Sequence, residues 1–296
     1  MRLLTNEKYL LPSCDLRPWI DFYVQSGGAA SCAPMVTRLP TSATASLTLV
    51  LSGRVSLLEA ESGRLVPLPQ LFVSGPQSRS ATMVAEGEFR CLVVVFAPGC
   101  WHALFDAAPE SLIDQQQEVS GVGCRWLHSL TDQLATGPRH LLLQRLEAGL
   151  RGWVRQTALG PRRGCFDDRD TRWMRDTLLH TAPGEMAQAY GLSLRQIERR
   201  FLQQFGLTPK AYQRLARMAL LLARLGQVPA TTPLAGLAAE LGYADQAHLS
   251  REHKQLIGVP PGRLGRLVEE DPEYWVYRIL PGALATGSGM SRFFKP

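Results

Sequence analysis

This chain of 296 residues lacks the marks of an exported or membrane-bound protein. Its first residues, Met1 to Lys8, contain no apolar run, and no stretch of the chain reaches the length of a transmembrane span. The six cysteines include no Cys-x-x-Cys pair, and this scatter favours buried or incidental thiols over a redox switch. We therefore expect a cytoplasmic protein that makes no membrane contact.

Motifs for catalysis are equally scarce. The segment Gly121-Val-Gly123 lacks the third glycine of a dinucleotide-binding loop and follows no clear strand, and no nucleophile elbow is present. We therefore predict that the protein is not an enzyme and holds no cofactor.

Excess positive charge is confined to the C-terminal part of the chain. Residues 1–160 hold 13 Lys+Arg and 13 Asp+Glu, whereas residues 161–296 hold 19 and 13, which accounts for the whole formal charge of +6. A basic surface attracts phosphates through counterion release. The uneven distribution indicates one nucleic-acid-binding half in a chain long enough for two domains.

A helix-turn-helix pattern occurs twice in the C-terminal third. The first unit covers residues 184–209 and the second covers residues 237–261. Gly191 corresponds to Gly242 at an offset of 51, and Gly206 corresponds to Gly258 at an offset of 52. Two such units indicate a protein that reads two places on DNA.

Each unit has the signals of two helices joined by a turn. A glycine ends the short first helix, and Ser193 or Asp245 provides the N-cap of the longer second helix. Apolar residues at helical spacing predict the buried face of each longer helix: Ile197, Phe201 and Phe205 in the first unit, and Leu249, Leu256 and Ile257 in the second.

The opposite face of each longer helix carries side chains that suit the major groove. Arg can bridge guanine O6 and N7, and Gln can pair with adenine N6 and N7. Between the units, residues 207–225 read as one helix started by Thr208 and Pro209, with a length on the order of 28 Å. Successive major grooves on one face of DNA repeat at roughly 34 Å, so this helix could hold two recognition helices in adjacent grooves.

At these residues the chain resembles the AraC/XylS family of bacterial transcription regulators. The match covers residues 170–268 and is most specific over Leu-Ala-Ala-Glu-Leu-Gly-Tyr-Ala-Asp-Gln-Ala-His-Leu-Ser-Arg-Glu, residues 237–252, followed by Gly-Val-Pro-Pro, residues 258–261. His253 departs from the family, which usually has an apolar aromatic residue there, and we interpret it as a packed, neutral core histidine.

The resemblance implies a seven-helix DNA-binding domain that binds double-stranded promoter or operator DNA, with RNA polymerase as a further partner. The residues at the family's base-facing positions are Arg195, Gln196, Arg199, Gln246, His248, Ser250 and Arg251. We assign contacts with the DNA backbone to Ser193, Arg200, Lys210 and Lys254.

The N-terminal part has the pattern of a small antiparallel β-barrel. Short apolar or alternating runs at residues 46–51, 55–58, 71–74 and 90–96 are separated by Gly and Pro turns. Residues 71–79 and 95–100 resemble the cupin-like sensor domain often joined to AraC-type regulators. Metal-dependent cupins use closely spaced histidines, and the barrel segment has only His102, so we predict no metal.

Two helices are expected between the halves, at residues 123–135 and 140–158. Leu142, Leu146, Leu150 and Trp153 form an apolar stripe on the second helix, which leaves two interpretations open, domain core or subunit interface. Helices in this region pair the subunits in related regulators, so the resemblance implies a homodimer as a further assembly. Residues 161–164 read as a linker.

We therefore predict an α+β multidomain protein: a cupin-like antiparallel β-barrel with trailing helices at residues 1–160, an all-α domain with two helix-turn-helix motifs at 165–268, and a tail at 269–296 that packs on one domain. The expected function is a sequence-specific DNA-binding transcription regulator that responds to a small effector. The alternatives are a cupin-like enzyme fused to a DNA-binding domain and an effector-independent architectural DNA binder.

Overall fold

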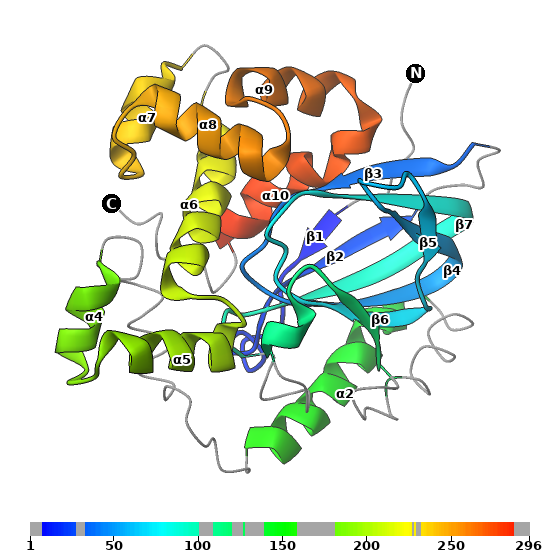
Figure 1. The fold of residues 1–296 in the computed structure, drawn as a ribbon. Helices are drawn as coiled ribbons and strands as arrows, with labels where there is room; N and C mark the ends of the chain where they lie inside the picture. The colour runs from blue at the N-terminus through cyan, green and yellow to red at the C-terminus, as the bar shows by residue number, and fades with distance from the viewer. Residues whose placement is uncertain are drawn as a thin grey trace.

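A computed structural model describes residues 8–27, 33–100, 109–119, 127, 139–158, 181–226, 228 and 232–286. Figure 1 shows an antiparallel sheet built by the N-terminal half, which we call the β domain, with the C-terminal helices packed along one side of it. The expected fold class, an antiparallel N-terminal sheet followed by a helical domain with two helix-turn-helix units, is confirmed. The boundaries between the domains stay a prediction.

The β domain is organised around two long strands that pair along most of their length. The path of neighbouring strands is β1-β2-β7-β4-β6-β8, with β3 paired to β7 and β5 paired to β4. The strands are β1 (Lys8–Leu10), β2 (Ile20–Gly27), β3 (Met35–Leu39), β4 (Ser46–Leu58), β5 (Leu65–Pro67), β6 (Leu71–Ser74), β7 (Ala81–Phe96) and β8 (Gln116–Glu118).

The two runs predicted at residues 46–51 and 55–58 are parts of the single strand β4, so the expected break between them was wrong. The register of β4 against β7 shifts between Val50 and Arg54, and Gly53 has a φ of 78°. Such a bulge bends a strand without ending it. The bend divides the paired strands into two halves, one bordered by β2 and β6 and the other by β3 and β5.

Helix α2 (Arg139–Ala158) confirms the second of the two helices expected between the domains. Its stripe of Leu142, Leu146, Leu150 and Trp153 is buried in one cluster with the outward-facing side chains of the sheet. The stripe is therefore part of the domain core, which confirms the first of the two interpretations, domain core, for these residues. The helix expected at residues 123–135 and the linker at 161–164 lie outside the described residues, apart from Leu127.

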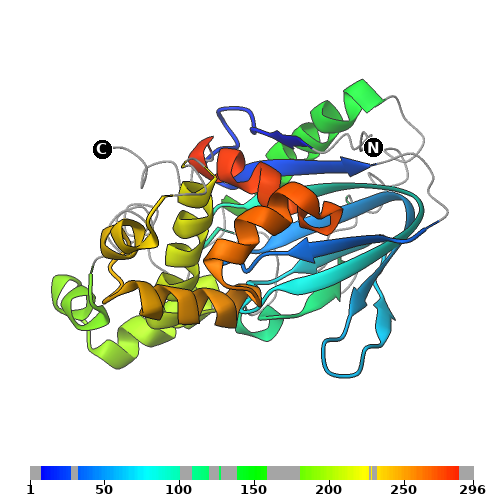
Figure 2. The same ribbon diagram turned by 90° about the horizontal axis from the view of Figure 1, so that it is seen from above.

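The C-terminal domain consists of α4 (Pro183–Ala189), α5 (Leu194–Phe205), α6 (Pro209–Leu225), α7 (Leu234–Glu240), α8 (Gln246–Ile257) and α9 (Pro261–Glu270). The short η4 (Pro272–Tyr274) and α10 (Trp275–Thr286) follow. Figure 2 shows α10 and α6 lying beside the sheet. No helix within the described residues is long and apolar enough to cross a membrane.

The described part of the C-terminal tail, residues 269–286, joins the two domains, whereas we expected the tail to pack on one of them. The indole Nε1 of Trp275 donates a hydrogen bond to Thr37 Oγ1 at 3.0 Å, and Arg38 Nε lies 2.8 Å from a carboxylate oxygen of Glu273. Tyr277 is buried in the same cluster as the helix-turn-helix core. The tail therefore connects β3 to the C-terminal helical domain.

Candidate nucleic-acid interface and ligand pocket

The first unit folds as its local sequence predicts. Gly191 adopts a φ of 60° after α4, and Ser193 then caps α5 by accepting a hydrogen bond from the backbone of Gln196 at 3.3 Å. Gly206, with a φ of 71°, ends α5 and donates to Leu202 O at 2.9 Å. A left-handed glycine therefore ends each of the two helices of the unit.

The second unit repeats this geometry. Gly242 has a φ of 73°, and Asp245 Oδ1 accepts a hydrogen bond from the backbone of His248 at 2.6 Å. Gly258, with a φ of 88°, ends α8. The two predicted helix-turn-helix units are therefore both present.

A single core holds the two units on α6. In α5, Phe201 and Phe205 stack at a centroid distance of 4.9 Å and both contact the ring of Tyr212. In α8, Leu249 and Leu256 are buried in the same cluster. Helices α5 and α8 thus pack on the same supporting helix, α6, which fixes their relative position.

Polar contacts also fix α8 against α6. Glu252 accepts a hydrogen bond from Tyr243 OH at 2.9 Å and lies 3.3 Å from Arg214 Nε. The guanidinium of Arg217 stands over the Tyr243 ring at 5.2 Å from its centroid. These half-buried pairs restrain the rotation of α8 about its axis, which determines the side chains that it presents outward.

His253 is a core residue, as interpreted. It is fully buried, its Nδ1 lies 2.5 Å from the carbonyl oxygen of Val259, and its Nε2 has no hydrogen-bond partner among the described residues. Burial lowers the pKa of the imidazole to about 4, so the ring is neutral at neutral pH and donates through Nδ1.

The predicted base-facing residues lie in the N-terminal halves of α5 and α8, the part of a recognition helix that contacts base edges in helix-turn-helix proteins. Arg195, Gln196, Arg199, Gln246 and Arg251 are exposed, and His248 and Ser250 are half-buried.

Two of these side chains have structural contacts that we did not predict from the sequence. Gln196 Oε1 accepts hydrogen bonds from the backbone and hydroxyl of Ser193, at 2.8 and 2.9 Å, and so completes a capping box. The His248 ring packs edge-on against Tyr243 at 5.3 Å. Gln196 can therefore read a base only by giving up this cap or by using its amide nitrogen.

The residues assigned to the DNA backbone are less uniform. Ser193, Lys210 and Lys254 are exposed at or near helix ends, whereas Arg200 is half-buried and has other interactions within the protein.

The β domain contacts the C-terminal ends of α5 and α8, opposite the ends that carry the predicted base-facing residues. The backbone N–H of Ser80 donates to Leu256 O at 2.9 Å, and its hydroxyl donates to Ile257 O at 3.2 Å. At α5, a Cβ on Gly99 would lie 2.7 Å from the ring of Phe205, so the backbone at Gly99 packs directly against this side chain. These contacts join positions far apart in the sequence, and no local pattern signals them.

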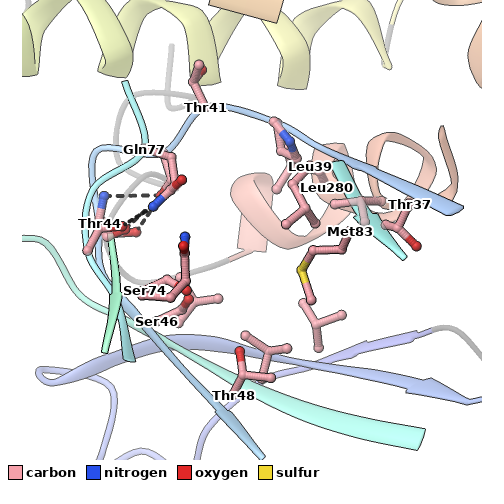
Figure 3. Close-up of a pocket in the computed structure, with 18 of the residues that line it drawn as sticks. Thr37, Leu39, Thr41, Thr44, Ser46, Thr48, Ser74, Gln77, Met83 and Leu280 are labelled. Carbon is pink, nitrogen blue, oxygen red and sulfur yellow. Dashed lines mark hydrogen bonds between the residues drawn. The ribbon is translucent and has the colours of Figure 1, made fainter. Parts of the chain in front are cut away.

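A cavity of about 230 Å³ lies between the two halves of the bent sheet. Both halves of β4 and β7 line it, and it is closed on one side by Tyr212 and Ala216 of α6 and by Trp275, Leu280 and Leu284 of α10 (Figure 3). The ligand-binding residues could not be assigned from the sequence, because identifying this cavity requires the strand register and the position of α10.

No group of three His, Cys, Asp or Glu side chains that could hold a metal ion occurs within the described part of the chain. His102 lies outside the described residues.

Comparison with known proteins divides the chain in the same way. Residues 186–266 match the family "Helix-turn-helix domain", and residues 8–118 match "Domain of unknown function (DUF6597)". No curated protein matches the chain.

Among solved structures, the chain is similar to ToxT from Vibrio cholerae, at 9% identity over 82% of this chain and 96% of that one, with a TM-score of 0.45. It is also similar to the AraC-like transcriptional activator CuxR, at 15% identity over 74% and 86%, with a TM-score of 0.28. A third similarity is to an RmlC-like cupin from Desulfovibrio desulfuricans, at 16% identity over 32% and 88%, with a TM-score of 0.22.

Proposed function

We propose that this protein, whose residues 186–266 form an AraC-type helix-turn-helix domain, is a sequence-specific transcription regulator controlled by a small molecule. The observation that carries the proposal is the presence of two recognition helices on one supporting helix, both exposed along their N-terminal halves. Helix α6 has 17 residues, which correspond to about 26 Å. This length supports binding in two successive major grooves, which repeat at roughly 34 Å.

We assign base contacts to the exposed side chains at matching places of the two helices, Arg199 and Arg251, together with their neighbours Arg195, Gln196, Gln246, His248 and Ser250. Neither Arg199 nor Arg251 has an ion-pair partner within the described residues. An exposed guanidinium that forms no ion pair within the protein can make the bidentate contact with guanine O6 and N7 without breaking an existing ion pair. Ser193, Arg200, Lys210 and Lys254 are assigned to phosphates.

The test is to replace Arg199 and Arg251 singly with Ala and to measure binding to an operator selected from fragmented genomic DNA. A guanine contact should cost about 1–3 kcal/mol at the selected site and relax the preference at one base pair. The matched control is Arg54→Ala, because Arg54 is also exposed but lies on β4. An equal loss on random DNA would indicate a phosphate contact, and no sequence preference in the unmodified protein would leave an architectural DNA binder.

Control by a small molecule is supported by the position of the cavity. Its walls combine the β domain with α6, which supports both recognition helices, and with α10, which is bonded to β3 through Trp275 and Thr37. A ligand in this cavity contacts both domains at once. If it binds two domain arrangements with different affinities, it shifts the population between them and hence the affinity for DNA.

The experiment for this control is a melting screen of the full chain against a metabolite library, followed by operator binding with each hit. A ligand that binds only the folded state at a hundredfold excess over its Kd stabilises it by about 2.7 kcal/mol. A compound that stabilises the protein and leaves operator affinity and transcription unchanged is not the effector.

Two further partners are proposed, RNA polymerase and a second copy of the chain. Analytical ultracentrifugation with and without operator tests the dimer.

A further inference from the structure

The strand register separates the two faces of β4. Leu47 and Leu49 point to the outer face, where they are buried with the apolar stripe of α2. Ser46 and Thr48 alternate with them and line the cavity. Ser74 of β6 is the direct partner of Ser46 and lines the cavity beside it. Hydroxyl groups are thus placed on the inner face, where an apolar core would have aliphatic side chains.

The lining has a polar side and an apolar side. Figure 3 shows Thr44, Ser46, Ser74 and Gln77 together on one side of the cavity. Leu39, Met83 and Leu280 lie on the other side, together with Thr37, whose hydroxyl already accepts the hydrogen bond of Trp275. A molecule that fits this division has an apolar body and one polar end.

Two polar groups of the lining have unused hydrogen-bonding capacity. The hydroxyl of Thr41, a residue only 6% exposed, has no partner among the described residues. The half-buried Gln77 donates from its amide nitrogen to Gly75 O at 3.0 Å, so the amide oxygen is the acceptor that this side chain can offer a ligand. Buried polar groups normally have partners, so the unpaired Thr41 hydroxyl fits a cavity whose ligand forms hydrogen bonds.

The lining also lacks positive charge. No Lys, Arg or His is among the described residues that line the cavity, and the one carboxylate, Asp21, is 2% exposed and already has a partner in the protein. Burial raises the pKa of the Cys91 thiol to about 12, so it is neutral at physiological pH. An anionic ligand would lose its hydration here without gaining a counter-charge, which is strongly unfavourable.

We propose that this cavity binds an uncharged small molecule with an apolar body and one hydroxyl, carbonyl or amide end. The polar end lies toward Ser46, Ser74 and Gln77, and the body lies against Met83 and Leu280. This assignment rests on the proposed function only in making the ligand the effector of the regulator; the chemistry of the cavity stands apart from it.

The experiment uses the full chain and three probes that share one hydrocarbon body, 1-octanol, octanoate and octylammonium, each displacing the neutral dye Nile red at pH 7.4. We expect 1-octanol to bind at least tenfold more tightly than either ion. In Ser46→Ala/Ser74→Ala, the advantage of 1-octanol over the ions should shrink several-fold. The control Ser62→Ala, at an exposed turn outside the cavity, should leave it unchanged.

Octanoate or octylammonium binding as tightly as 1-octanol would overturn the proposal, and so would failure of 1-octanol to displace the dye at its solubility limit. Both comparisons use the unmodified protein, so they do not depend on whether the variants fold. Operator binding is measured on the same samples: specific DNA binding without octanol binding removes only the ligand class, and octanol binding without specific DNA binding removes only the proposed function.

Discussion

The buried imidazole of His253 should lower the stability of the protein as the pH is lowered, within a window set by two pKa values. Burial lowers the pKa of this histidine in the folded state to about 4, against 6.5 for an unperturbed side chain. The folded protein therefore favours the neutral ring, and the unfolded chain takes up the proton first as the pH falls. The contribution of His253 is complete above pH 6.5 and is lost progressively from there toward pH 4.

The size of the loss follows from the two pKa values. Between pH 7.5 and pH 5, the difference in proton binding between the folded and unfolded states lowers the free energy of unfolding by about 2 kcal/mol. His253→Phe removes the titrating group and places there the kind of residue that Phe201 provides in the first unit. It also leaves Val259 O without its hydrogen bond, a cost that does not depend on pH.

The assay is urea unfolding of the unmodified protein and of His253→Phe at pH 7.5 and pH 5, followed by circular dichroism. All other titrating groups are common to the two proteins, so the change in their stability difference isolates His253. We expect the unmodified protein to lose about 2 kcal/mol relative to the variant on moving to pH 5. A stability difference that stays constant between the two pH values would show that the imidazole has the same pKa in the folded and unfolded states, as a solvated ring would, and the packing argument would fail.

Two further predictions concern the bend in the sheet and the attachment of the tail. Gly53→Ala should destabilise the protein by about 2 kcal/mol or more in the same assay, because the φ of 78° is strained for alanine and the added Cβ would lie 2.7 Å from Glu86 O. Gly63→Ala has a similar φ of 68° but no atom within 4 Å, so it should cost only about 1 kcal/mol, and equal losses would refute the steric argument. Trp275→Phe should cost about 1–2 kcal/mol by leaving the buried Thr37 hydroxyl unpaired, and a Trp275→Phe/Thr37→Val protein that is no more stable than Trp275→Phe would contradict that cause.

The local parts of the DNA-binding domain could be predicted from the sequence, because each depends on neighbouring residues. Left-handed glycines, a Ser or Asp N-cap and apolar residues at helical spacing are sufficient to place α5 and α8, and the structure has Gly206 and Gly258 at their ends. The same holds for α2, whose apolar stripe predicted its extent. The packing of His253 was also predictable, since its place in α8 matches that of Phe201 in α5.

The parts that the sequence did not predict depend on contacts between distant segments. Leu51 to Val55 reads as a break, and only the pairing of β4 with β7 across the bulge makes it continuous. Ser80 has no local signal for its bonds to the end of α8, and the tail at Trp275 has none for its bond to β3. The cavity arises from the same long-range arrangement, so its lining could not be assigned before the strand register was known.

Footprinting of the full chain on a selected operator tests the central claim most directly. The full chain is required because Tyr277 and Leu284 of α10 belong to the core of the helix-turn-helix domain. If α5 and α8 enter successive major grooves, hydroxyl-radical cleavage should show two protected patches on one face of the DNA, about 10–10.5 base pairs apart for each bound domain. A single short patch for each bound domain would contradict the account, because only one of the two helices would then read the DNA.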